Sequence, residues 1–72
     1  MNTYEIRVNN AVVESKALNE WSAMKQLGIF KEIGDMIDYL QRKGKDGTLN
    51  AVWIYQVELN GQTTLAYVKR TA

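Results

Sequence analysis

The stretch AVWIYQVELNGQTTLAYVKR, residues 51–70, decides the fold of this 72-residue chain, because it carries the strongest local signal for a β-hairpin. Asn60-Gly61 lies between two runs that are rich in β-branched and aromatic residues. A tight type I′ turn needs positive φ at both central positions, and Asn and Gly tolerate that conformation. Counting outward pairs Leu59 with Gln62 and fixes the register of every residue beyond them.

This register divides the side chains of the hairpin between two faces of a sheet. We assign the bulkier, uncharged face to the core: Ala51, Trp53, Tyr55, Val57, Leu59, Ala66 and Val68. The other face, here named the reverse face, holds Val52, Ile54, Gln56, Glu58, Thr63, Leu65, Tyr67 and Lys69. A half-buried hairpin normally has one polar face, so the large apolar groups on the reverse face need an explanation.

Residues 3–15, TYEIRVNNAVVES, alternate between apolar and polar side chains and predict a first hairpin. Asn9-Asn10 suits a two-residue turn, since Asn tolerates the left-handed conformation. The resulting pairs are Val8 with Ala11, Ile6 with Val13 and Tyr4 with Ser15. Glu5 then lies opposite Glu14, which is unfavourable unless the two side chains splay apart.

The middle of the chain has apolar residues at every third position, namely Leu18, Trp21, Met24, Leu27, Phe30 and Ile33. A straight α-helix would wind such a stripe around to its far side, so we expect a break. Gly28 suits a left-handed C-terminal cap, and Ser15 or Asn19 can cap the start of the helix. Whether residues 16–43 form one helix or two stays open.

A second helix is predicted over 30–43, or over 36–43 if Asp35 is its N-cap. Asp38 would then lie near the positive end of the helix dipole, and Arg42, Lys43 and Lys45 would lie near its negative end. Both placements stabilise a helix. Its buried stripe would consist of Ile33, Ile37 and Leu40. The whole chain, 1–72, therefore reads as one small α+β domain of the form ββ-α(α)-ββ, in which one or two helices pack on one face of an antiparallel sheet.

Composition removes several kinds of site. The chain has no Cys and no His, which excludes disulfides, thiolate ligands and imidazole ligands. Its formal charge is +1, whereas dedicated nucleic-acid binders are far more basic. We see no signal peptide and no apolar run near the roughly 18 residues that span a membrane. We therefore expect a cytoplasmic protein without a metal, a cofactor or a membrane partner.

Catalysis has little support in this sequence. Without His or Cys, base and nucleophile would have to be carboxylates, lysines, hydroxyls or tyrosines. Glu32, Asp35 and Asp38 are best explained by helix capping and solubility, and the glycine spacing matches no phosphate-binding loop. Trp21, Trp53, Met24 and Met36 are interpreted as core residues. We expect a protein that is not an enzyme.

The apolar reverse-face residues suggest a contact surface, because apolar patches with polar rims mark such sites. The predicted partner-binding residues are Val52, Ile54, Leu65 and Tyr67, with Glu58 and Lys69 around them. The partner would be another protein or a second copy of this chain. Two alternatives stay open. In one, another segment of the chain covers this patch, or the patch is simply exposed without a partner. In the other, a one-residue slip of register exchanges the two faces.

Nucleic-acid binding is the alternative function. Its candidate residues are Arg42, Lys43, Lys45, Lys69 and Arg70, with Tyr67 available to stack on a base. So few cations would give weak, salt-sensitive binding. Our first hypothesis is a small non-enzymatic protein-binding module. Its small size and its lack of a metal, a disulfide and a catalytic group are typical of inhibitors that phages and other mobile elements direct against host machinery. The targets of such inhibitors include CRISPR effectors, restriction enzymes and polymerases.

Overall fold

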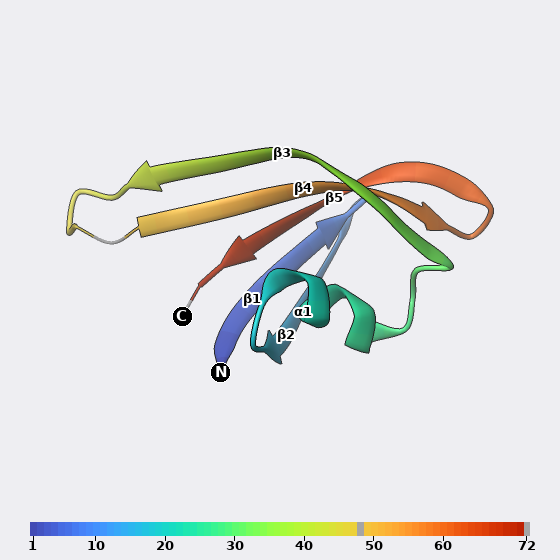
Figure 1. Cartoon of the computed structure of the whole chain (residues 1–72), viewed down its shortest axis with the longest axis horizontal. Helices are drawn as coiled ribbons and strands as arrows, with labels where there is room; N and C mark the ends of the chain where they lie inside the picture. Colours follow the sequence, from blue (N-terminus) through green and yellow to red (C-terminus); the bar gives the residue numbers. More distant parts are fainter. Residues whose placement is uncertain (48, 72) are drawn as a thin grey trace.

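The computed structural model describes residues 1–47 and 49–71, and for Arg42 and Leu49 it describes the backbone alone. Its elements are β1 (Asn2–Val8), β2 (Ala11–Ala17), α1 (Glu20–Leu27), β3 (Glu32–Lys43), β4 (Leu49–Leu59) and β5 (Gln62–Arg70). In this part of the chain, the strands form one antiparallel sheet with the order β2-β1-β5-β4-β3 (Figure 1). The first and last strands of the chain are thus neighbours at the centre of the sheet.

Both predicted hairpins are confirmed, together with their registers. In the first hairpin, Val8 pairs with Ala11, Ile6 with Val13, Tyr4 with Ser15 and Glu5 with Glu14. In the second, Leu59 pairs with Gln62, Val57 with Thr64, Tyr55 with Ala66 and Trp53 with Val68. Asn60 has a φ of 52° and Gly61 of 79°, so both central residues of the second turn are left-handed, as a type I′ turn needs. In the first turn Asn9 is left-handed, with a φ of 55°, and Asn10 is not.

The predicted second helix, over 30–43 or 36–43, is wrong, because β3 occupies residues 32–43 and pairs with β4. The predicted ββ-α(α)-ββ fold is wrong for the same reason: the described residues form mostly antiparallel sheet with one short helix. From Ile33 to Met36 the strand advances three residues while β4 advances two, and a second shift follows before Asp38. Such bulges break the alternation of a strand, so its apolar spacing resembles that of a helix.

Helix α1 has the ends that the sequence predicts. Of the two candidate caps, Asn19 is the one used, and its Oδ1 accepts a hydrogen bond of 2.8 Å from the amide of Ser22. Gly28 ends the helix with a φ of 68°, and its amide donates to the carbonyl of Lys25. The described residues contain no helix with the length and apolar character needed to cross a membrane.

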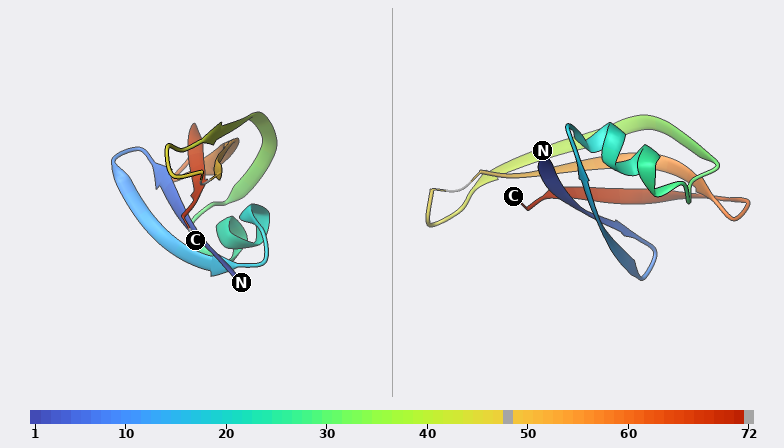
Figure 2. Two further views of the ribbon diagram at one scale, coloured as in Figure 1. Left: turned by 90° about the vertical axis from the view of Figure 1, so that its left-hand side faces the viewer. Right: turned by 90° about the horizontal axis from the view of Figure 1, so that it is seen from below.

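The core lies between α1 and one face of the sheet. Seen end-on, the sheet curls, and α1 lies on its concave side (Figure 2). The buried apolar residues are Tyr4, Ile6, Val8, Ala17, Ala23, Met24, Ala51, Tyr55, Val57, Ala66 and Val68, with Trp53 and Leu59 partly buried beside them. The core face assigned to the second hairpin is therefore confirmed.

Two residues interpreted as core differ from that expectation. Met36 is 49% exposed and Trp21 is 39% exposed, whereas Met24 is fully buried. Met36 lies on the outermost strand, beyond the reach of α1, which contacts β1 and β2. Trp21 lies on α1 and places its ring 6.2 Å from that of Tyr55, so it borders the core without entering it.

Candidate protein-binding surface

The reverse face spans the width of the sheet, on the side opposite α1. Strand pairing places its side chains in two adjacent rows. One row runs from β3 to β2 through Asp38, Ile54, Tyr67, Arg7 and Val12. The next row runs through Leu40, Val52, Lys69, Glu5 and Glu14. The reverse face of the second hairpin is thus the centre of a larger surface.

The predicted apolar residues of this surface remain accessible to solvent. Leu65 is 38% exposed and Tyr67 is 41% exposed, while Val52 and Ile54 are half-buried. Helix α1 cannot cover them, because its contacts with the sheet are made on the other face, where Tyr55 reaches Glu20. Leu65 and Tyr67 are therefore available to a partner.

Two further apolar residues belong to the same surface and were not predicted. Leu40 is 44% exposed and lies opposite Val52, and Val12 is 52% exposed and lies opposite Arg7. Leu40 was assigned to a helix, so its place beside the hairpin could not be inferred. Val12 was detectable, because it alternates with the inward-facing residues of the first hairpin.

A shallow hollow of about 420 Å³ lies in the middle of the reverse face, between β1, β4 and β5. Its lining residues are Glu5, Arg7, Val52, Tyr67 and Lys69. Arg7 Nη2 lies 3.9 Å from Glu5 Oε1, and both side chains are well exposed, so this pair adds little to the free energy of folding. The hollow therefore combines an apolar floor with charges of both signs.

Of the two charged residues predicted beside the apolar group, Lys69 lines the central hollow, and Glu58 lies diagonally across from Leu65, nearer the turn. Glu58 pairs with Thr63 near the turn of the second hairpin, about 13 Å along β4 from Ile54. Its Oε2 lies 3.9 Å from Lys31 Nζ, and with Glu32 and Asp35 it lines a separate hollow of about 300 Å³. Glu58 is thus at one end of the sheet, away from the central hollow.

The basic residues considered for nucleic-acid binding do not form one patch. Lys43 and Lys45 lie where the β3–β4 hairpin extends beyond β5, about 14 Å from Lys69 by strand spacing (Figure 1). Arg70 follows Lys69 on β5 and therefore points to the opposite face. The side chain of Arg42 lies outside the described residues.

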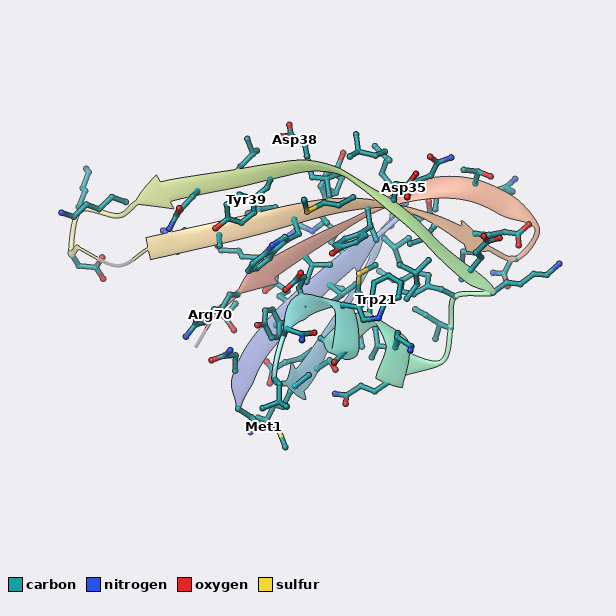
Figure 3. All side chains as sticks on the ribbon, viewed as in Figure 1. Met1, Trp21, Asp35, Asp38, Tyr39 and Arg70 are labelled. Atoms are coloured by element: carbon teal, nitrogen blue, oxygen red, sulfur yellow. The ribbon has the colours of Figure 1, made fainter. Side chains whose placement is uncertain are left out.

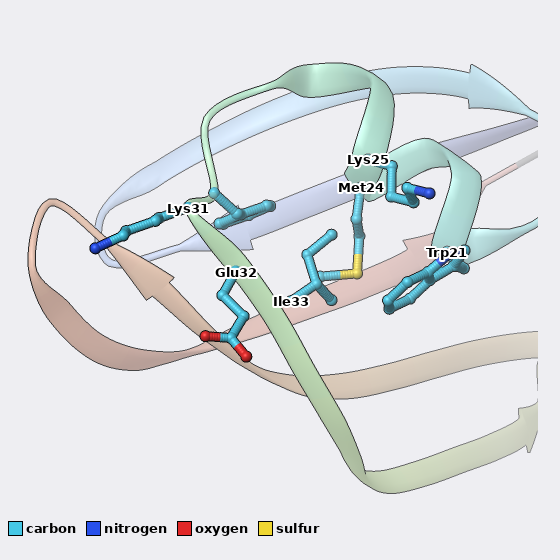
Figure 4. Close-up of a pocket in the computed structure, with 7 residues that line it drawn as sticks. Trp21, Met24, Lys25, Lys31, Glu32 and Ile33 are labelled. Atoms are coloured by element: carbon cyan, nitrogen blue, oxygen red, sulfur yellow. The ribbon is translucent and has the colours of Figure 1, made fainter.

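A second hollow, of about 350 Å³, lies between α1 and the start of β3 (Figure 4). Its lining residues are Trp21, Met24, Lys25, Phe30, Lys31, Glu32 and Ile33. Lys25 Nζ lies 5.7 Å from the ring centre of Trp21, at cation–π distance, and Lys31 points away toward Glu58. This hollow is mainly the open end of the core under α1.

Among residues 1–47 and 49–71, no group of three or more carboxylates is placed to hold a metal ion. Comparison with protein-family models, with curated proteins and with solved structures finds no match to this chain. What the chain binds therefore has to be inferred from its own surfaces.

Proposed function

We propose that this chain is a non-enzymatic protein-binding module, and that its contact surface is the reverse face of the sheet. The observation that carries this proposal is the exposure of Leu65 and Tyr67 on the sheet face opposite α1. The surrounding Arg7, Glu5 and Lys69 supply charges of both signs. An apolar centre with a charged rim is the usual composition of a protein interface.

Burial of the exposed apolar side chains supplies the free energy of binding. Burying a fully exposed large apolar side chain is worth about 1.5–3 kcal/mol. Because Leu65 and Tyr67 are roughly two-fifths exposed, a partner that covers them gains roughly two-fifths of that free energy for each. Leu40 and Val12 add comparable amounts at the two sides of the surface. The charged rim then selects the partner, because a like charge placed opposite it is costly.

The mode of action that suits such a module is inhibition, in which a small chain covers a functional surface of a larger host protein. A phage or other mobile element would be a suitable source of such an inhibitor. A cytoplasmic location belongs to the same proposal, since a chain without cysteine fits a reducing compartment.

Capture experiments with matched variants test this function. The tagged chain is compared with Leu65→Asp/Tyr67→Asp and with a control, Ile29→Asp, which changes an apolar residue of similar exposure in the connector after α1. We expect the unmodified chain and the control to capture one host protein in stoichiometric amount, and the double variant to lose it. Capture that is equal for all three chains contradicts the proposal.

Nucleic-acid binding is the second candidate, supported by one arrangement on the same face. Tyr67 lies between Arg7 and Lys69 in the central hollow, as an aromatic platform with flanking cations. Glu5 in that hollow opposes this use. Titration with a single-stranded oligonucleotide separates the candidates, because binding through phosphates falls steeply with salt and is lost in Lys69→Glu, whereas apolar docking changes little with salt.

A further inference from the structure

β3 is an outermost strand of the sheet, yet both of its sides carry large exposed apolar residues. Met36, Ile37, Tyr39 and Leu40 are between 42% and 56% exposed. Asp38 and Tyr39 point to opposite sides of the strand (Figure 3). Apolar groups on both sides are typical of strands inside a sheet, whereas edge strands are normally short, charged or covered.

The other edge of the sheet has the usual protection. β2 carries Glu14 and Lys16 on one side, and on the other side α1 packs against it through the hydrogen bond from Ser15 Oγ to the carbonyl of Ala23. β3 carries charges at Asp38 and Lys43, but the main contacts of α1 are with β2 and β1 and not with β3. The two edges are thus unequal, and β3 is the one suited to receive another strand.

The backbone of β3 is also arranged for pairing. From Asp38 to Lys43 the strand pairs regularly with β4, so alternate residues direct their backbone groups outward. The amide of Tyr39 is hydrogen-bonded to Asp38 Oδ1 over 2.8 Å. This carboxylate satisfies an edge amide in the single chain, and the carbonyl of an incoming strand would replace it.

The distribution of charge along β3 identifies the incoming strand. On one side of Leu40 along the chain the strand carries Glu32, Asp35 and Asp38, and on the other side the sequence has Arg42, Lys43 and, just beyond the strand, Lys45. When two identical strands pair antiparallel about a two-fold axis, the first half of each lies opposite the second half of the other. Acidic residues then face basic residues at both ends, with the apolar residues at the centre.

We propose that two copies of this chain pair antiparallel through β3 and form one continuous sheet. In this dimer, Leu40 lies close to the two-fold axis, and the reverse faces of the two copies join. The two Leu40 side chains then lie next to each other across the new ladder, and Tyr39 of each copy lies opposite Gln41 of the other. The proposal concerns the edge of the sheet, whereas the proposed function rests on Leu65 and Tyr67; Leu40 belongs to both surfaces.

Sedimentation equilibrium of charge variants tests this pairing. Asp35→Lys/Asp38→Lys makes both halves of β3 basic, and Lys43→Glu/Lys45→Glu makes both halves acidic. Each variant alone then places like charges opposite each other, and we expect its dimer dissociation constant to rise at least about tenfold. An equimolar mixture of the two variants restores opposite charges between positions 35 and 45, so we expect it to dimerise more tightly than either variant alone.

Two controls make the outcome decisive. Glu14→Lys reverses a charge at the other edge, on β2, and should leave the dimer unchanged. Leu65→Asp/Tyr67→Asp alters the reverse face and should also leave it unchanged, which separates this dimer from one formed face to face. An unmodified chain that stays monomeric up to millimolar concentration overturns the proposal, and so does a dimer that persists in both charge variants or is lost in either control.

Discussion

The phenolic hydroxyl of Tyr55 donates a hydrogen bond to Glu20 Oε1 over 3.2 Å and so joins the middle of β4 to the first residue of α1. Tyr55 is 7% exposed, and its ring lies against that of Trp21. Burial raises the pKa of Tyr55 above its ordinary value, and the negative charge and the hydrogen bond of Glu20 raise it further. The contact therefore links the position of the helix to the protonation of one tyrosine.

We expect the free energy of unfolding to fall at alkaline pH because of this contact. A raised pKa means that the folded chain holds the Tyr55 proton after the unfolded chain has released it. The stabilisation is complete below the ordinary tyrosine pKa of roughly 10 and is lost as pH rises through the higher pKa of the folded state. Denaturant unfolding between neutral pH and pH 11 measures it.

Tyr55→Phe is the control for this pH dependence. It should flatten the alkaline part of the curve and cost about 1 kcal/mol at neutral pH, the usual worth of one hydrogen bond. Tyr39→Phe removes a tyrosine that is 42% exposed and should leave the slope in place. An identical alkaline slope in Tyr55→Phe would show that the contact with Glu20 is not its cause.

Gly34→Ala should destabilise the fold at the first bulge of β3. A Cβ at this position would lie 3.0 Å from the carbonyl oxygen of Gln56 on β4, closer than carbon and oxygen normally pack. We expect a loss of about 1–3 kcal/mol, the usual cost of overpacking, measured by thermal unfolding. Asp35→Ala, the next residue, should change stability by less than about 0.5 kcal/mol.

Met24 and Met36 should respond very differently to the same substitution. Met24 is fully buried between α1 and the sheet, so Met24→Ala should cost about 2–5 kcal/mol through lost contacts and a cavity. Met36 is 49% exposed, so Met36→Ala in a dilute monomer should cost less than about 1 kcal/mol. Denaturant midpoints compare them, and similar losses would contradict this burial.

Ser15→Ala should weaken the attachment of α1 to β2. Ser15 Oγ donates to the carbonyl of Ala23 over 3.1 Å and accepts from Gln26 Nε2 over 2.6 Å. Its removal leaves polar groups in a buried place without these partners, which costs about 1–3 kcal/mol. Hydrogen exchange should show earlier opening of α1 amides, whereas Ser22→Ala on the first turn should not reproduce that opening.

The candidate surface was only partly predictable from sequence. Val52, Ile54, Leu65 and Tyr67 were assigned to one face, because a two-residue turn fixes which side chains lie together. Their neighbours Arg7 and Leu40 could not be inferred, since they reach the hairpin through the pairings of β1 with β5 and of β3 with β4. The alternation of apolar and polar residues predicts on which face of its hairpin a residue lies. It does not predict which other strands pair with that hairpin.

The sequence by itself determined the two hairpins, their registers and the end of α1 at Gly28, because turns and caps depend on the φ preferences and side chains of a few adjacent residues. It left the start of α1 open between Ser15 and Asn19, of which the structure uses Asn19. Only the tertiary structure decided the state of residues 32–43. Their spacing suits a helix locally, but pairing with β4 satisfies the inward-directed backbone groups of β3 and places the extra residues in bulges. That stabilisation comes from contacts with β4, the next strand of the chain, and the pattern within residues 32–43 does not contain them.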